Sequence, residues 1–413
     1  MFNKFTLKNF RTHIDTTIEL KDIILIIGSN NSGKSNFLAG ISFFSSLISR
    51  ANPANDKNKG VNGANYYPHK HTLSSPDEPI SFLCEWIDNN YIIKYEIHIY
   101  CINNEERLIG CKEIIKISGN ESYESTHGST EASSEILLRS KLQKELPNSL
   151  KKIVDEFFRG LAFVYYYNFQ PSMLKGIAFS GKYEKGIIVP NPKKAFKKNP
   201  NQILNIANEL GREGENFQEL IKYIKQNEEE TYGRFLGYLR RFEDSFNGII
   251  IDEETAKWQF DMGNSRFPYF DADKISDGMI KAAAVALLCA MKRPPAVIMI
   301  EEVENGINQR NIAEFITWLV ATSDNGIKTQ FIITSHSPSV IREFSRRTNQ
   351  VYNVHLKKKK GYISEITNLN DAIKPLARFG TIKEDAITEV DGVIQISASE
   401  LTELFYNGIL GEL

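Results

Sequence analysis

The chain has 413 residues, enough for one large domain or two modest domains with buried cores. Charged residues make up 24% and hydrophobic residues 41%, which is ordinary for a soluble globular protein. A formal net charge of −1 excludes a general electrostatic attraction to nucleic acid or to a membrane surface. No apolar run approaches the ~20 residues of a membrane helix, so we expect no membrane partner.

The cysteines and the N-terminus indicate the compartment. Cys84, Cys101, Cys111 and Cys289 are too sparse for a disulfide framework and contain no C-x-x-C pair. They predict reduced thiols in a cytoplasmic protein. Residues 1–10 alternate apolar and polar side chains, which is typical of a strand and not of a signal peptide.

The first stretch that predicts chemistry is residues 28–35, with the sequence GSNNSGKS. Two strands predicted over residues 2–20 and an apolar strand at 23–27 precede it, and a helix predicted over 36–49 follows. This order of strand, loop and helix is the setting that the P-loop pattern G-x-x-x-x-G-K-[ST] requires. A chance match in a turn rich in Gly, Ser and Asn would not bring that setting with it.

The residue types of this loop fit a nucleoside triphosphate. Gly28 and Gly33 permit a tight loop whose backbone N–H groups face phosphate oxygens, and Lys34 supplies a charge for the β- and γ-phosphates. The Ser35 hydroxyl is suited to bind Mg²⁺. We therefore predict ATP and Mg²⁺ as ligands, with these residues in contact with the nucleotide: Gly28, Asn30, Asn31, Ser32, Gly33, Lys34, Ser35 and Asn36.

The middle of the chain predicts a mixture of strands and helices. Residues 80–117 alternate as antiparallel strands do, and residues 118–134 have the composition of a loop. Further along, the patterns predict a helix within 135–158, a strand at 161–167, an irregular connection at 171–200, helices within 200–246 and a strand pair at 248–262.

A second informative stretch is the apolar run 296–300, which Glu301 and Glu302 follow. Open α/β sheets bind ligands at the carboxyl ends of their strands. Glu301 would hold Mg²⁺ and Glu302 would polarise the attacking water. Taken alone, the pattern also fits a strand that ends in solvated acids. The P-loop upstream favours the catalytic interpretation.

Two more motifs complete a recognisable order. Residues 274–280 contain S-D-G immediately before an apolar helix, and residues 331–338 form a strand that ends in T-S-H-S-P. In this order the motifs resemble those of ABC-type ATPase heads of the RecF, SMC and OLD families, especially AAA_21-type bacterial ATPases. The resemblance extends from residue 1 to about 343. It implies an α/β fold: an ABC-type P-loop NTPase head with a mixed central sheet, an antiparallel β-subdomain and a helical lobe that carries the signature motif.

The resemblance assigns roles to particular residues. Ser276, Asp277 and Gly278 resemble the ABC signature, which in the family caps the γ-phosphate bound by the opposite protomer, so ATP would hold together a head-to-head dimer. His336 resembles the switch histidine that senses this phosphate. The loop after the acidic strand departs from the family, because Val303 stands where proline is usual.

Two further positions follow from the same resemblance. Arg11, in N-F-R, lies where family members often bring an arginine toward the nucleotide. Gln170 fits either the Q-loop glutamine, which would contact Mg²⁺, or an ordinary polar residue at a strand end. Both alternatives stay open from the sequence.

The motifs divide the chain into four segments. Residues 1–175 would form the N-terminal lobe, 176–270 the helical lobe and connection, and 271–348 the part of the same head with the signature, the acidic strand and the histidine. Residues 349–413 would be a C-terminal extension with a strand near 361–366 and two helices, available to a partner. This extension is too short for a Toprim nuclease domain and has no D-x-D, so any effector would be encoded separately.

Two functions fit these features. One is an ATP-driven sensor and scaffold in bacterial anti-phage defence, resembling the ATPase components of Septu- or PARIS-like systems and acting as a homo-oligomer with a separate nuclease or toxin. The other is a RecF/SMC-like DNA repair ATPase that clamps DNA directly. The basic runs 193–198 and 357–360 could contact phosphates or could be solvated loops.

Overall fold

The computed structural model describes residues 1–50, 70–71, 73–75, 77–88, 90–101, 108–129, 142, 145–176, 209–251, 256–324, 329–357, 362–378, 380 and 382–412. The basic run 193–198 and most of the run 357–360 lie outside these residues. The chain forms two compact units. Unit 1 comprises residues 1–166, 295–303 and 328–413, and unit 2 comprises residues 167–294 and 304–327.

A six-stranded sheet forms the centre of unit 1, with the strand order β15-β14-β3-β13-β12-β8. The four central strands run parallel, and β15 joins the edge antiparallel to β14. All five residues of β3 are buried, because a parallel strand inside such a sheet is covered on both faces. The strands are β3 (Ile23–Ile27), β8 (Val164–Tyr167), β12 (Val297–Ile300), β13 (Gln330–Thr334), β14 (Val351–Lys357) and β15 (Ile363–Asn368).

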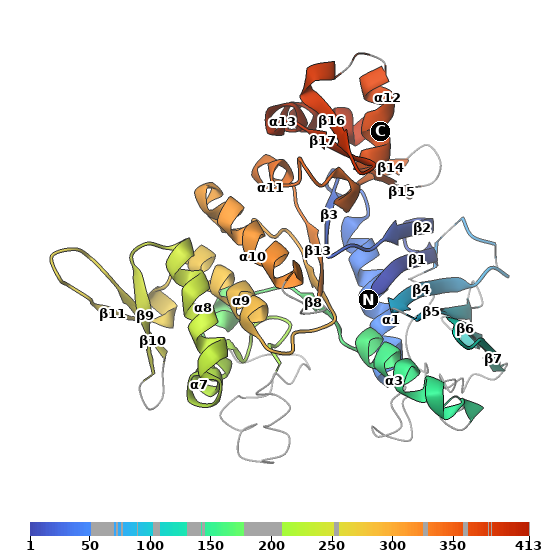
Figure 1. The fold of residues 1–413 in the computed structure, drawn as a ribbon, viewed down its shortest axis with the longest axis horizontal. Coiled ribbons are helices and arrows are strands. Elements are labelled where there is room, and N and C mark those ends of the chain that lie inside the picture. The colour runs from blue at the N-terminus through green and yellow to red at the C-terminus, as the bar shows by residue number, and fades with distance from the viewer. Residues whose placement is uncertain are drawn as a thin grey trace, which may run out of the picture. The chain divides into compact units, whose positions relative to one another are not determined.

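The second sheet of unit 1 is antiparallel, with the order β2-β1-β4-β5-β6-β7. Two helices, α1 (Lys34–Arg50) and α3 (Asn148–Ala162), lie beside this sheet (Figure 1). A single hydrophobic core is formed by the inner face of the sheet, these two helices and one face of the central sheet. This arrangement confirms the predicted mixed α/β architecture with an antiparallel β-subdomain. The strands are β1 (Phe2–Phe10), β2 (His13–Glu19), β4 (Ile80–Asp88), β5 (Tyr91–Cys101), β6 (Leu108–Gly119) and β7 (Tyr123–Ser129).

Strand β7 corrects the prediction of a loop over residues 118–134. Its sequence YESTHGS contains little apolar side-chain area, so the composition resembles that of a loop. The segment is nevertheless extended, because it pairs antiparallel with β6 over seven residue pairs. Pairing with a neighbouring strand overrides a weak local preference.

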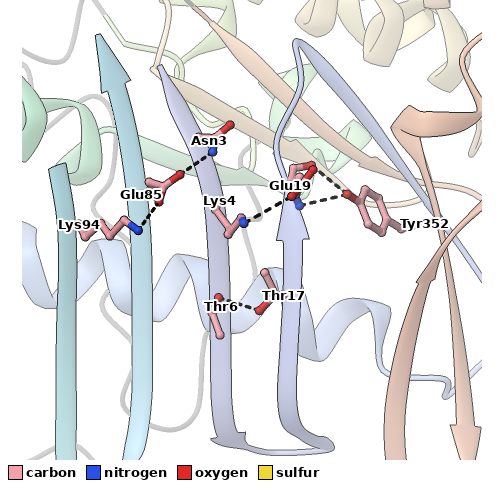
Figure 2. A network of polar contacts seen from close by, with 8 residues as sticks. All are labelled: Asn3, Lys4, Thr6, Thr17, Glu19, Glu85, Lys94 and Tyr352. Carbon is pink, nitrogen blue, oxygen red and sulfur yellow. Dashed lines mark hydrogen bonds and ion pairs between the residues drawn. The ribbon is translucent and has the colours of Figure 1, made fainter. Parts of the chain in front are cut away.

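The outer face of the antiparallel sheet carries a polar network that reaches the central sheet (Figure 2). The backbone N–H of Glu19 donates to the Tyr352 hydroxyl (3.0 Å), which donates to the Glu19 carbonyl (3.2 Å). This exchange fastens β2 to β14. Across the face the contacts are Lys4–Glu19 (3.4 Å), Thr6–Thr17 (2.8 Å), Asn3–Glu85 (2.6 Å) and Lys94–Glu85 (3.1 Å).

The C-terminal part of unit 1 is a small lobe that follows the central sheet. Asn370 anchors it from the interior: its Oδ1 accepts from Thr348 Oγ1 (3.1 Å) and from the Ile394 N–H (2.7 Å). The predicted strand near 361–366 and both predicted helices are confirmed, whereas β14 was not predicted. The lobe contains α11 (Pro338–Arg342), α12 (Leu369–Arg378), β16 (Ile387–Val390), β17 (Val393–Ile396), α13 (Ala398–Tyr406) and α14 (Ile409–Glu412).

Unit 2 is mainly helical, as expected for a lobe that carries a signature motif. Helix α9 (Asp277–Ala290) is buried on nearly all sides, which suits its run of alanine and leucine, and it packs on α8. A three-stranded sheet with the order β11-β10-β9 extends the predicted strand pair by one strand. The elements are α4 (Pro171–Leu174), α7 (Phe217–Asn227), α8 (Glu229–Phe242), β9 (Phe246–Ile251), β10 (Ala256–Phe260), β11 (Tyr269–Asp271) and α10 (Ile312–Asp324). Among the described residues, no helix is both long enough and apolar enough to cross a membrane.

Candidate nucleotide-binding site

Three parallel strands of unit 1 bring the sequence motifs to one edge of the central sheet. Strand β3 ends just before the P-loop, β12 ends just before Glu301 and β13 ends two residues before His336. The strands are in register, with Ile300 opposite Ile333 and Thr334 opposite Ile26. The P-loop, the two carboxylates and the histidine segment therefore meet where an α/β sheet binds its ligand.

The backbone conformation of the P-loop explains why residues 28 and 33 are glycines. Gly28 has φ +145° and Gly33 has φ +113°, a range that side-chain-bearing residues rarely adopt. A Cβ atom on Gly28 would lie 2.1 Å from the Val354 carbonyl oxygen, and one on Gly33 would lie 2.1 Å from Ser364 Oγ. Only glycine fits at either position, so the loop closes tightly against β14 and β15.

The interior of the loop is polar and suited to an anion. Lys34 Nζ donates to the carbonyl oxygens of Gly28 and Ser29, both at 2.9 Å, and Lys34 is only 6% exposed. Ser32 Oγ is buried and has no hydrogen-bond partner among the described residues. A buried ammonium group, an unsatisfied hydroxyl and the N-terminus of α1 together fit phosphate groups.

Glu301 is held from two sides. The Ser35 hydroxyl donates to its Oε1, and the Tyr166 hydroxyl of β8 donates to its Oε2. Burial, followed by the hydrogen bond and the negative charge of Glu301, raises the pKa of Tyr166, so Tyr166 remains a donor. The oxygens of Ser35 and Glu301 fit Mg²⁺, which binds through one or two protein oxygens, water and phosphate. The described residues contain no cluster of three or more His, Cys, Asp or Glu side chains, and Mg²⁺ does not require one.

Glu302 differs from Glu301 in its backbone and its exposure. Its φ of 46° lies in the left-handed region, which is uncommon for a residue other than glycine. Its side chain is exposed, and its backbone N–H donates to Thr334 Oγ1 at 2.9 Å. Such conformations concentrate at functional sites.

Arg11 lies beside the start of helix α1. Its φ is 50°, and its Nη1 donates to Asn36 Oδ1 at 3.2 Å. Asn36 Nδ2 in turn donates to Thr12 Oγ1 at 3.0 Å. The turn between β1 and β2 is thus fixed to the helix that follows the P-loop.

Three residues at this edge were missed from the sequence: Tyr166, His13 and Ser364. His13 Nε2 donates to the Gly33 carbonyl (3.0 Å) while Nδ1 accepts from Thr16 Oγ1 (2.9 Å). Burial lowers the pKa of His13 to about 4, so the ring is neutral at pH 7. Ser364 Oγ donates to the Ser32 carbonyl at 2.6 Å. No motif spacing in the sequence predicts these residues, since only the folded sheets bring them close to the P-loop.

The signature residues lie in unit 2, at the start of α9. Ser276 caps the helix, with its Oγ accepting from the Met279 N–H at 3.3 Å. Asp277 forms an ion pair with Lys175 (2.7 Å). A Cβ on Gly278 would lie 2.0 Å from the Gly306 carbonyl oxygen, so the helix start approaches the turn after the acidic strand as closely as glycine allows.

Gln170 also belongs to unit 2, immediately before α4. Its side chain is exposed, and its Nε2 donates to Asn168 Oδ1 at 3.4 Å. The structure therefore groups the predicted site residues into two sets. Gln170, Ser276, Asp277 and Gly278 lie in unit 2, and Arg11, the P-loop residues, Glu301, Glu302 and His336 lie in unit 1.

The sheet order, the P-loop and the acidic strand end define the class as a P-loop NTPase head of the ABC type. The chain belongs to the AAA_21 family, because the family profile described as "AAA domain, putative AbiEii toxin, Type IV TA system" matches residues 23–342. No curated protein sequence matches the chain significantly.

Solved structures of SMC heads are similar in fold. An SMC head bound to the C-winged helix domain of ScpA matches with a TM-score of 0.51 and 14% identity, over 90% of this chain and 99% of that chain. An SMC head from Thermotoga maritima matches with a TM-score of 0.40 and 15% identity, over 89% and 98%. The fold comparison rests on the first of these and confirms the predicted fold.

Proposed function

We propose that this chain is a Mg²⁺-dependent ATPase that forms a head-to-head dimer around ATP and controls a separately encoded effector in anti-phage defence. The observation that carries the proposal is the meeting of Lys34, Ser35, Glu301 and Glu302 at one edge of the central sheet. Each of these residues has a matching task in phosphoryl transfer, where a protein mainly positions water and neutralises charge.

The residues of unit 1 divide the work as follows. Lys34 and the loop N–H groups bind the β- and γ-phosphates, and Arg11 and the loop asparagines contact the nucleotide. Ser35 and Glu301 hold Mg²⁺, which when bound neutralises charge on the phosphate oxygens. Glu302 accepts a hydrogen bond from the attacking water, and His336 contacts the γ-phosphate.

The proposed dimer is supported by the family resemblance of the signature residues at the start of α9. In this proposal Ser276, Asp277 and Gly278 of one subunit face the γ-phosphate bound to the other. The N-terminus of α9 offers the positive end of its helix dipole to that phosphate. Hydrolysis removes the contact and loosens the dimer, which supplies a two-state signal to a partner.

Partner binding is assigned to the C-terminal extension, residues 349–413. The similar SMC head binds a domain of ScpA, so heads of this fold accept protein partners. For the present chain we propose a nuclease or toxin as the partner. Because α12, α13 and the β16–β17 hairpin follow the central sheet directly, a partner there would lie on the same unit as the P-loop.

The alternative is a RecF/SMC-like clamp that binds DNA directly. The charges on the outer face of the antiparallel sheet favour this alternative less. Four lysines there are each paired with a carboxylate, so their charge is balanced and not presented as a basic patch. The pairs are Lys4–Glu19 (3.4 Å), Lys8–Asp15 (3.0 Å), Lys94–Glu85 (3.1 Å) and Lys116–Glu124 (3.0 Å).

The proposal is tested by trapping the dimer and then searching for its partner. Glu302→Gln keeps the side-chain shape but removes the carboxylate, so light scattering with MgATP should give twice the chain mass of 47.0 kDa. Lys34→Ala should remain a monomer under the same conditions. The tagged chain is then co-expressed with the products of neighbouring genes. A nuclease or toxin that co-purifies supports the defence role, whereas a monomer in both variants contradicts the ATP-held dimer.

A further inference from the structure

The strained backbone of Glu302 needs a cause. Its φ of 46° is disfavoured for a residue with a side chain, and such a conformation persists only where the surroundings fix it. Glu301, one residue earlier, is absent from the positive-φ residues of the described chain. The constraint therefore acts on the backbone of Glu302, the carboxylate residue that we propose orients the attacking water.

Thr334 supplies the constraint. Its Oγ1 accepts from the Glu302 N–H at 2.9 Å, and its carbonyl oxygen accepts from the Val303 N–H at 3.1 Å. Two consecutive N–H groups after β12 are thus bound by one residue. Thr334 is completely buried and pairs with Ile26 of β3, so it is itself held in the centre of the sheet.

The same residue leads directly into the histidine segment. Ser335 N–H donates to the Ile26 carbonyl (3.2 Å), and Ser337 N–H donates to Ser335 Oγ (2.9 Å). The short turn that contains His336 is therefore tied to β3 at its start. One buried residue, Thr334, connects the backbone of Glu302 with the turn that carries His336.

We propose that Thr334 is a positioning residue that holds the Glu302 backbone in its left-handed conformation and so aims the carboxylate at the attacking water. The inference rests on the proposed ATPase function. It adds that hydrolysis depends on a threonine hydroxyl that touches neither nucleotide nor metal. A catalytic carboxylate displaced by about 1 Å can lower the rate about a hundredfold. Because Glu302 acts on the attacking water, we expect the loss in turnover and not in ATP affinity.

The test compares Thr334→Val with Thr334→Ser. Valine keeps the branched shape but removes the acceptor for the Glu302 N–H, whereas serine retains it. We expect Thr334→Val to lower kcat about 10- to 100-fold with the Kd for ATP within about threefold of wild type, and Thr334→Ser to keep most of the turnover. In a Glu302→Gln background Thr334→Val should cause little further loss, because it acts through Glu302.

Hydrogen exchange gives a second readout that does not need activity. The Glu302 amide should exchange slowly in the wild type and in Thr334→Ser, and faster in Thr334→Val or, if that variant does not fold, in Thr334→Ala. Full turnover in Thr334→Val, or equal losses in the valine and serine variants, would overturn the inference. A wild-type protein without ATPase activity contradicts the proposed function instead, and the exchange of the Glu302 amide then decides the positioning role alone.

Discussion

At the scale of single residues, hydroxyl groups hold the Glu301 carboxylate and the Glu302 backbone after β12. Tyr166 and Ser35 each donate to one oxygen of Glu301, and Thr334 holds the backbone of Glu302. The carboxylates themselves could be predicted from the sequence because they directly follow an apolar strand. The contact of Tyr166 with Glu301 could not, since Tyr166 lies more than 30 residues away in the chain and follows no spacing rule. Thr334 belongs to the T-S-H-S-P motif, but its contact with the Glu302 backbone could not be predicted, because only the pairing of β12 with β13 brings the two residues together.

Tyr166→Phe tests the support of Glu301. Loss of a hydrogen bond to a carboxylate costs about 1.5–3 kcal/mol, so the Mg²⁺ concentration for half-maximal ATPase activity should rise about tenfold or more. Turnover at saturating Mg²⁺ should fall less. Tyr165→Phe is the matched control, because it removes the same hydroxyl from the adjacent residue of β8. An unchanged Mg²⁺ requirement in Tyr166→Phe would show that Tyr166 does not orient Glu301.

His13, which is bonded to the P-loop, makes the free energy of unfolding of the protein dependent on pH. Burial lowers its pKa to about 4 in the folded protein from 6.5 in the unfolded chain, so the unfolded chain binds more protons between these values. Stability from this group is complete above pH 6.5 and falls as the pH drops toward 4. From pH 7.5 to 5.0 the loss should be about 2 kcal/mol.

Denaturant unfolding of His13→Gln at pH 7.5 and 5.0 measures this contribution. The glutamine amide can still donate to the Gly33 carbonyl but does not titrate, so the pH dependence should flatten by about 2 kcal/mol. His71→Gln serves as the comparison, since His71 is also buried and burial lowers its pKa as well. A pH dependence in His13→Gln equal to that of the wild type would contradict a buried neutral ring.

At the scale of elements, the hairpin of β14 and β15 contacts the candidate nucleotide site. The family profile ends at residue 342, yet Ser364 of β15 donates to the P-loop carbonyl of Ser32 and lies where a Cβ on Gly33 would have to be. The Ser364 N–H also donates to the Thr12 carbonyl at 2.7 Å. The C-terminal segment is therefore packed on the P-loop and is not a separate appendage.

Ser364→Ala should weaken ATP binding. One hydrogen bond to the loop contributes about 0.5–1.5 kcal/mol, which corresponds to a rise in Kd of about two- to tenfold. Equilibrium titration with ATP measures it, alongside the melting temperature of the ligand-free protein. Ser399→Ala, which removes an exposed hydroxyl at the start of α13, is the control and should not change Kd. Equal Kd values in Ser364→Ala and wild type would exclude a role for β15 at the loop.

The elements around the site could be predicted because their patterns are distinctive. Strands β3, β12 and β13 are apolar runs with motif residues at their ends, and α1 follows the P-loop directly. Strands β7 and β14 could not, for two different reasons. Strand β7 is polar throughout. In β14, Asn353 and His355 interrupt the apolar pattern, although Asn353 is buried and its Nδ2 donates to the Leu410 carbonyl.

At the scale of the whole molecule, each unit is built from segments that are distant in the chain. Unit 1 combines the N-terminus, the acidic strand and the C-terminal lobe, whereas unit 2 is inserted between them. Motif order can be read from a sequence but this interleaving cannot, because strand order depends on pairing between segments more than 300 residues apart, as between β3 and β14. The resemblance to ABC heads supplied what local patterns could not.

The shared site is tested by mixing two inactive variants. Lys34→Ala removes the charge of the P-loop, and Asp277→Arg places a cation beside Lys175 at the signature. A mixed dimer contains one site with an intact P-loop and an intact signature. We expect turnover to recover partly when the variants are mixed at fixed total protein. Activity no greater than the sum of the separate variants, in a sample shown to contain mixed dimers, would contradict sites shared between subunits.

In the function proposed above, the P-loop edge of unit 1 binds and hydrolyses ATP. The most direct measurement is phosphate release from MgATP by the purified wild-type chain, beside Lys34→Ala and Glu302→Gln, with ATP binding titrated for all three. We expect steady turnover in the wild type, neither binding nor turnover in Lys34→Ala, and tight binding with slow turnover in Glu302→Gln. No phosphate release by the wild type, or equal release by wild type and Lys34→Ala, would contradict the proposed function.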